Sequence, residues 1–323
     1  MSQVKICVIG GSGFLGTRLL KLLDSQGIQL QNIDKNRSVE FPSVTAIQDI
    51  REPSGLASVL SPADVVIHLA AEHKDDVTPS SLYYDVNVQG TRNILNAMDQ
   101  AGITSIIFTS TVAVYGLNRD NPDETFSVAP FNHYGKSKYQ AEELIREWQQ
   151  KGSDRRAIIL RPSVIFGETN RGNVYNLLSQ MASGRFMMIG SGNNQKSMTY
   201  VGNVAAFIMF IFAKMKPEFL VYNYTDLPNI STRELIDTVR KELDIKILPL
   251  KIPYFAGLLA GYCFDLMALI LQRKLNISSV RIRKFCATTR FNAEKAHGSG
   301  FVVPHPLLQA LRDTIQFEFI HKN

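Results

Sequence analysis

The amino-acid sequence predicts an α/β fold: a Rossmann-type doubly wound parallel sheet followed by a smaller C-terminal α/β lobe. Short β-branched runs alternate with helical patterns through the first half of the chain, which predicts βαβ units. These runs are apolar almost throughout, as in VVIHLA at 65–70, and a sheet covered by helices on both faces needs such strands. A glycine-rich turn also joins the first strand to the first helix.

The predicted elements follow in order along the chain. Strands are expected at 4–10, 29–34, 43–48, 64–71, 105–111 and 157–165, and helices at 14–25, 82–101 and 134–150. After residue 166 the alternation loosens, and helical patterns at 172–183, 203–214 and 231–243 are separated by loops that contain Gly, Asn and Pro. We therefore expect 1–166 to form the sheet domain, to which later segments return, and 167–323 to form most of the smaller lobe.

The composition is that of an ordinary globular protein, with 45% hydrophobic and 20% charged residues in 323. The start of the chain runs directly into a strand pattern and lacks the features of an export signal. Cys7, Cys263 and Cys286 have neither metal nor disulfide spacing, and Cys7 falls within an apolar strand. These features predict a cytosolic protein without a metal site.

The net charge of +6 is concentrated in the C-terminal third of the chain. Its basic residues there include Lys251, Arg273, Lys274, Arg281, Arg283, Lys284 and Arg290. An anionic membrane surface or a pyrophosphate would suit such a patch. Nucleic acid ranks last as a partner, because no nucleic-acid-binding motif accompanies these residues.

One apolar segment, 254–271, has three interpretations. It is interrupted only by Asp265 and is flanked by basic residues, among them Arg273 and Lys274. A membrane-spanning helix needs about 20 apolar residues, so this run is borderline, and Asp265 would be costly in lipid. The segment could also be a helix in the membrane interface, with Arg273 and Lys274 at the level of the headgroups. Periodicity by itself favours the third interpretation, a helix buried in the smaller lobe.

The turn IGGSGFLG at 9–16 predicts a dinucleotide site. Gly11, Gly13 and Gly16 fit the G-x-G-x-x-G pattern, and Gly10 begins a second pattern with a spacing of three. Such glycines allow a pyrophosphate to approach the backbone at a helix N-terminus. Asp34 ends the second strand, where a carboxylate binds ribose hydroxyls and repels a 2′-phosphate. This favours NAD, although Lys35 and Arg37 could accept NADP.

A Tyr–Lys pair and a row of hydroxyl residues form a candidate catalytic group. The strand at 106–116 carries hydroxyl residues at its carboxyl end, where doubly wound sheets bind ligands. Tyr134 and Lys138 are four residues apart at the start of a helix, and therefore face the same way. A surface Tyr packed on a Lys stem would give the same spacing. The predicted dinucleotide site nearby favours a catalytic role for the pair.

In these motifs the chain resembles the extended short-chain dehydrogenase/reductase family, in particular its nucleotide-sugar epimerases and dehydratases. The matching segments are GGSGFLG (10–16), HLAA (68–71), DVNVQGTRNIL (85–95), TSTVAVYG (109–116), YGKSK (134–138) and RPSVIFG (161–167). Further segments resemble the bacterial 4-epimerases of N-acetylglucosamine carried on diphospho-undecaprenol. These segments are AAEHKDDVTPSSLYYDVNVQGTRN, FNHYGKSK, RGNVYNLL, GYCFD and SSVRIRKFCATT.

The resemblance implies interconversion of GlcNAc-diphospho-undecaprenol and GalNAc-diphospho-undecaprenol for O-antigen or another surface polysaccharide. It also implies a peripheral location at the cytoplasmic face of the inner membrane. It favours membrane contact through 254–284 over core burial of 254–271, and it leaves room for a homodimer. The alternatives are an epimerase of UDP-N-acetylglucosamine, a UDP-4-keto-sugar reductase, and a non-catalytic NAD(P)-binding sensor on the same fold.

The family's roles transfer to the matching positions as follows. Tyr134 would take the proton of the sugar 4-hydroxyl, and Lys138 would lower the tyrosine's usual pKa of about 10 and hold the nicotinamide ribose. Thr111 would hydrogen-bond the same sugar oxygen. The residues expected to bind NAD are Gly10, Gly13, Phe14, Leu15, Gly16, Asp34, Asp49, Ile50, Leu69, Ala70, Ala71, Tyr134 and Lys138.

The residues expected to bind the substrate are Thr111 and six others. Lys196 aligns with a position that is usually Arg in the family and contacts the diphosphate, and Arg171 and Arg281 are further diphosphate candidates. Each could equally be a solvated surface charge. The remaining candidates are His73, Asn87 and Asn173, of which Asn87 would position elements near the site and His73 could be structural. YVGN at 200–203 departs from the family's YVDD-like stretch, which leaves the pocket there open.

Overall fold

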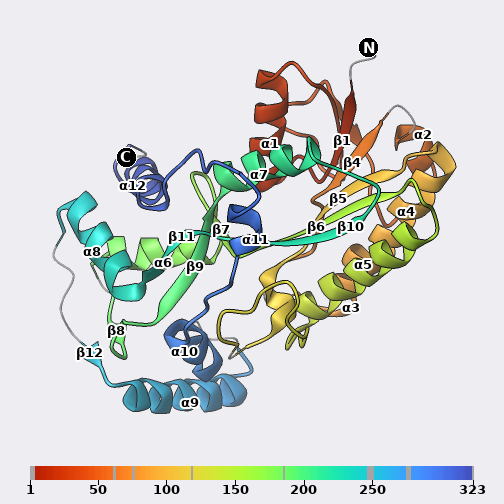
Figure 1. The fold of residues 1–323 in the computed structure, drawn as a ribbon. Coiled ribbons are helices and arrows are strands. Elements are labelled where there is room, and N and C mark those ends of the chain that lie inside the picture. Colours follow the sequence, from red (N-terminus) through yellow and green to blue (C-terminus); the bar gives the residue numbers. More distant parts are fainter. Residues whose placement is uncertain are drawn as a thin grey trace.

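The computed structural model describes residues 4–60, 63–74, 77–117, 119–184, 186–245, 251–273 and 278–321. Its main feature is a seven-stranded sheet in the order β10-β6-β5-β4-β1-β2-β3, in which all neighbouring strands are parallel (Figure 1). The strands are β1 (Lys5–Ile9), β2 (Gln29–Asp34), β3 (Thr45–Ile47), β4 (Val65–His68), β5 (Ser105–Thr109), β6 (Arg156–Pro162) and β10 (Phe219–Tyr224). The predicted doubly wound parallel sheet is confirmed. The strand order reverses between β1 and β4, where such sheets bind ligands.

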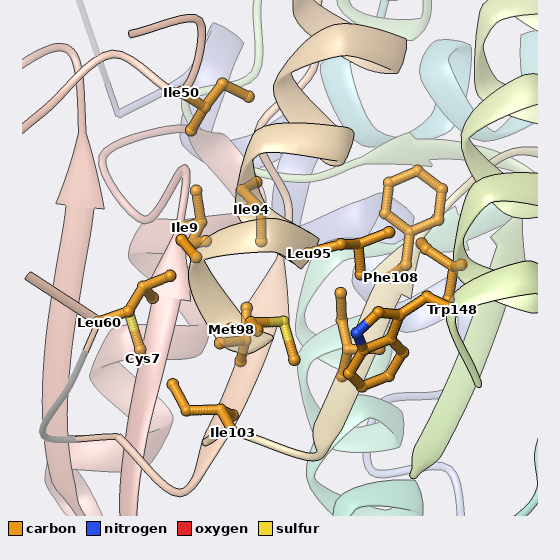
Figure 2. Close-up of a cluster of buried hydrophobic side chains, with 14 of the residues drawn as sticks. Cys7, Ile9, Ile50, Leu60, Ile94, Leu95, Met98, Ile103, Phe108 and Trp148 are labelled. Carbon is orange, nitrogen blue, oxygen red and sulfur yellow. The ribbon is translucent and has the colours of Figure 1, made fainter. Parts of the chain in front are cut away.

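Helices cover both faces of this sheet because its strands alternate their side chains between two cores. On β1, Cys7 and Ile9 face one core, whereas Ile6 and Val8 face the other. The first core is covered by α2 (Leu56–Leu60), α4 (Gly90–Ala101) and α5 (His133–Gln150), and Figure 2 shows Met98, Phe108 and Trp148 packed in it. The second is covered by α1 (Phe14–Ser25) and α7 (Val201–Phe212).

Two predicted elements are divided in the structure. The helix expected at 82–101 consists of α3 (Ser81–Tyr84), a π-helical turn η1 (Asp85–Gln89) and α4. The strand expected at 157–165 divides at Ser163, after which β7 (Val164–Phe166) leaves the large sheet and pairs with β9 (Gln195–Tyr200). A short 3-10 turn, η2 (Val112–Tyr115), follows β5.

The smaller lobe has a mixed sheet in the order β11-β9-β7, with β11 (Asp226–Ser231) antiparallel to β9. Three helices pack on this sheet around a separate core: α6 (Asn173–Ala182), α8 (Thr232–Leu243) and α12 (Leu307–Phe319). The short strands β8 (Met188–Ile189) and β12 (Lys251–Ile252) pair with each other, and α11 (Glu294–His297) lies against β10.

The apolar segment forms α9 (Tyr254–Leu271), which lies on the periphery beside α10 (Ser279–Cys286) (Figure 1). Only Gly257 and Gly261 of α9 are buried, so the core burial favoured by periodicity is wrong. Among the described residues, α9 is the helix long and apolar enough to cross a membrane. Lys274, one of its expected flanking charges, lies outside the described residues.

Candidate active site

The turn between β1 and α1 packs closely against neighbouring backbone, which several of its residues allow because they are glycines. Gly10 has φ +86°, and a Cβ there would lie 2.5 Å from the Ala70 nitrogen at the end of β4. A Cβ on Gly16 would lie 2.4 Å from the Gly11 Cα, so α1 runs very close to the turn. Gly13 begins α1 without a side-chain cap, which leaves the first N–H groups, including those of Phe14 and Leu15, available to an anion.

Asp34 lies beside this turn, at the carboxyl end of β2. Its Oδ2 accepts the Ser12 N–H at 3.1 Å and its Oδ1 accepts the Asn36 N–H at 2.9 Å. Asn32, which sequence reasoning missed, is buried and accepts the Gly11 N–H at 2.9 Å. The surrounding sequence offers little signal for it, because β2 (QLQNID) carries three amide residues. This cradle suits the pyrophosphate and a ribose of a dinucleotide such as NAD.

Other predicted cofactor residues line the neighbouring strand ends. The N–H groups of Leu69 and Ala70 both donate to the Ile9 carbonyl, which holds the 69–71 segment, with Ala71, beside the glycine turn. Asp49 is engaged by Arg51 at 2.6 Å, and this hydrogen bond lowers the pKa of the Asp49 carboxyl. The Ile50 side chain is buried. The Asp49 carboxylate is therefore already bound to a guanidinium.

Tyr134 and Lys138 occupy the first two turns of α5, which the Asn132 side chain caps by accepting the Gly135 N–H at 2.8 Å. Tyr134 is partly exposed, whereas Lys138 is 1% exposed. Burial lowers the pKa of Lys138 to about 7, although the nearby Glu142 acts in the opposite direction. Tyr134 and Lys138 are thus four residues apart on one helix, and Lys138 is the buried member of the pair.

Thr111 begins η2, and its Oγ1 accepts the Ala113 N–H at 3.1 Å. Its hydroxyl hydrogen can still be donated to a ligand. A Cβ on Gly135 would lie 2.8 Å from the Ala113 carbonyl oxygen, so this glycine lets α5 approach η2 closely. The structure thus brings the turn that carries Thr111 against the first turn of the helix that carries Tyr134 and Lys138.

Asn87 is buried and connects two elements of the candidate site. It is 1% exposed, and its amide accepts the Glu72 N–H at 2.8 Å and donates to the Glu72 carbonyl and the Ser137 Oγ. It therefore ties the loop after β4 to α5. His73, the next residue on that loop, is exposed.

The predicted diphosphate residues are spread over the smaller lobe. Lys196 on β9 donates to the carbonyls of Lys284 and Ala287 at 3.0 and 2.6 Å, and burial lowers its pKa to about 8. Arg171 forms an ion pair with Glu318 at 3.0 Å. Arg281 is exposed on α10, and Asn173 is exposed at the start of α6. Lys196 and Arg171 thus have structural partners of their own.

An aromatic group beside Tyr134 was not predicted. Tyr83 on α3 lies 6.5 Å from the Tyr134 ring centre, and the Tyr84 hydroxyl lies 3.0 Å from His133 Nδ1. The adjacent tyrosines in SSLYYD were the available signal. No group of three or more His, Cys, Asp or Glu that could hold a metal occurs within the described ranges.

Comparisons of sequence and of fold find similar known proteins. The profile of the NAD dependent epimerase/dehydratase family matches residues 6–223. The N-acetyl-alpha-D-glucosaminyl-diphospho-ditrans,octacis-undecaprenol 4-epimerase of Escherichia coli O157:H7 is 53% identical over 98% of this chain and 96% of its own length. A decarboxylating sterol-4-alpha-carboxylate 3-dehydrogenase of Saccharomyces cerevisiae is 27% identical over 92% of each chain. The UDP-glucose 4-epimerase structure of Thermotoga maritima superposes with a TM-score of 0.77 at 19% identity, covering 97% of this chain and 98% of the other.

Proposed function

Because this chain belongs to the NAD dependent epimerase/dehydratase family, we propose that it is a 4-epimerase that interconverts GlcNAc-diphospho-undecaprenol and GalNAc-diphospho-undecaprenol. The observation that carries this proposal is the 53% identity to the Escherichia coli enzyme over nearly the full length of both chains. The glycine turn and the Thr111, Tyr134 and Lys138 side chains support it, since they supply the groups that a sugar oxidation needs. The product would enter O-antigen or another surface polysaccharide.

The residues of the site have two tasks, which are proton transfer and orientation of the sugar. Tyr134 acts as a phenolate, which the Lys138 ammonium stabilises, and it becomes a neutral phenol when it takes the proton of the sugar 4-hydroxyl. Thr111 donates a hydrogen bond to the sugar oxygen and steadies the charge that develops there. The chemistry that NAD would supply when bound is reversible hydride transfer at C4, so no cofactor would be consumed.

Inversion requires the 4-keto sugar to present its other face before the hydride returns. A sugar held through its diphosphate can rotate about that linkage while the anion stays bound. A third donor of the Lys196 ammonium remains for the diphosphate after its two carbonyl contacts, and Arg281 on α10 supplies a second cation. Arg171 is less suited, because Glu318 already neutralises it.

We infer that α9 and α10 place the enzyme on the membrane surface that carries the undecaprenyl chain. The exposed face of α9 includes Phe255, Leu259, Leu266 and Ile270, which are 59–74% exposed. Burying such a side chain in lipid is worth about 2 kcal/mol. Asp265 lies on the side of α9 that meets α10, because its carboxylate accepts the Ser279 N–H of α10 at 3.2 Å.

The contacts of α9 with the protein and the charges on α10 favour an interfacial helix over a spanning one. Gly257 packs against Ile189 and Gly261 against Ser279, so one side of α9 is held along the protein. On α10, Arg281 and Arg283 are exposed at the level where anionic headgroups would lie. Lys284 of α10 also lies 5.2 Å over the Phe131 ring, three residues before Tyr134. A peripheral enzyme on the cytoplasmic face of the membrane would thus meet the lipid next to its catalytic helix.

The decisive experiment is product analysis with purified protein, NAD and GlcNAc-diphospho-undecaprenol, without any added reductant. The proposal predicts GalNAc-diphospho-undecaprenol at equilibrium and no net accumulation of NADH. Conversion of UDP-N-acetylglucosamine alone would instead favour a nucleotide-sugar epimerase, and a strict need for NAD(P)H would favour a ketoreductase. Tyr134→Phe is the matched inactive control, because it removes one hydroxyl and leaves the glycine turn intact. No conversion of any sugar would favour the sensor.

A further inference from the structure

A buried ion pair connects the catalytic helix to the large sheet. Glu142 on α5 and Arg161 on β6 are 0% and 3% exposed. Arg161 Nε donates to Glu142 Oε1 at 3.0 Å, and its second terminal nitrogen donates to Oε2 at 2.6 Å. Two apolar residues of similar volume often stabilise a fold as well as such a pair does, since burying both charges is costly. This pair therefore points to a role in geometry or charge.

Arg161 also reaches the second catalytic element. Its remaining terminal nitrogen donates to the Tyr115 hydroxyl at 2.8 Å, and that hydroxyl donates to Asn223 Oδ1 at 2.8 Å. Tyr115 is fully buried and is the last residue of η2, the turn that Thr111 begins. One guanidinium thus fixes the helix of Tyr134 and Lys138 relative to the turn of Thr111.

Glu142 is, in addition, a negative charge that acts on Lys138. The two residues are four positions apart, so they lie on one face of the helix with Tyr134. The Glu142 carboxylate raises the pKa of Lys138, against the larger lowering by burial. The other groups that face Lys138 are the Phe108 ring on β5 and the buried His68 on β4, whose pKa is lowered well below its usual value by burial. His68 is therefore neutral and does not replace the carboxylate.

We propose that Glu142 is a positioning residue that keeps Lys138 in its ammonium form, and that Arg161 holds it there while anchoring the turn of Thr111. This inference rests on the proposed epimerase chemistry, in which Lys138 must carry its positive charge. Glu142 and Arg161 touch neither the sugar nor the dinucleotide in this scheme. They act through Lys138 and Thr111.

The test compares Glu142→Gln with Glu142→Asp by the pH profile of kcat. Gln keeps the length of the side chain and an acceptor for Arg161 but removes the charge, so the pKa of Lys138 should fall further. The ammonium would then be lost at a lower pH, and the alkaline limb of the profile should move by about one pH unit toward acid. Asp is shorter but charged, and its alkaline limb should stay close to that of the wild type. A purely structural role predicts the reverse, with Asp impaired and the limb of Gln unmoved.

The double variant Glu142→Gln/Arg161→Met covers the case in which Glu142→Gln leaves Arg161 unpaired and fails to fold. The double variant also lacks the carboxylate. Once NAD binding and thermal unfolding show that it is folded, the alkaline limb of its kcat profile should be shifted toward acid. An unshifted limb in whichever neutral variant folds would overturn the inference. The wild type is measured first with the lipid-linked sugar. If it converts only UDP-sugars, the proposed substrate is wrong, and the same comparison proceeds with the UDP-sugar.

Discussion

The ammonium of Lys138 lies 3.9 Å from the centre of the Phe108 ring, at a position that is 1% exposed. The ring stabilises a cation that has lost its water. This compensation is incomplete, because burial still lowers the pKa of Lys138 from 10.5 to about 7. Lys138, which the proposed reaction needs, therefore lowers the stability of the cofactor-free fold.

Lys138→Met should therefore stabilise the cofactor-free protein at pH 7 by up to about 4 kcal/mol. The folded lysine has the lower pKa, so between pH 7 and 10.5 the unfolded chain binds more protons and the stability of the wild type rises with pH. The advantage of the variant should shrink over that window. Urea unfolding at pH 7 and pH 9.5 measures both effects, with the exposed Lys136→Met as control. Equal stability of wild type and variant at pH 7 would contradict the prediction.

Asp34→Asn should weaken NAD binding about tenfold or more, which corresponds to the loss of charged hydrogen bonds to a ribose. The amide can still accept the Ser12 or Asn36 N–H, so the glycine turn should persist. The repulsion of a 2′-phosphate also disappears, and the preference for NAD over NADP should fall. Calorimetric titration with each dinucleotide tests this. Asp24→Asn, an exposed change on α1, should alter neither affinity.

Lys196→Met should raise KM for the lipid-linked sugar more than it lowers kcat. The ammonium holds the end of α10 through two carbonyls, and its pKa is lowered to about 8. In the wild type the cation is lost as pH rises through about 8, so KM should increase between pH 7 and pH 9. In the variant KM should be high at both values. A variant whose KM still rises steeply over this range would show that another group controls the effect.

Much of the sheet and its nucleotide end could be predicted because they rest on local patterns. The turn at Gly10–Gly16 requires glycine at each close approach, and the position of Asp34 follows from strand length. Where long-range packing decides, the sequence was insufficient. Asn87 falls in a π-helical turn whose register depends on contacts with Glu72 and Ser137, neither of which is near it in sequence.

At Ser163 the chain leaves the large sheet, and this is a second place where long-range packing decides the structure. The sequence predicts a single strand over 157–165, but β6 and β7 belong to different sheets, and where they divide Ser163 Oγ lies 2.6 Å from Thr199 Oγ1 of the smaller lobe. Likewise, Lys196 is indistinguishable in sequence from a ligand-binding cation until α10 is placed beside it. Periodicity also misjudged α9, since an apolar helix looks alike whether protein or lipid will cover it.

The exposed face of α9 yields the last prediction, which separates membrane contact from catalysis. Leu259→Glu/Leu266→Glu/Ile270→Glu should abolish co-sedimentation with vesicles that contain anionic lipid, while thermal stability stays unchanged because the three side chains are 59–70% exposed already. Val39→Glu/Val302→Glu is the matched control, since these residues are 95% and 83% exposed elsewhere on the surface. It should sediment like the wild type. Turnover of a detergent-dispersed substrate should survive in both variants, whereas turnover of substrate in vesicles should fall only in the α9 variant. Undiminished vesicle binding by the α9 variant would mean that another surface meets the membrane.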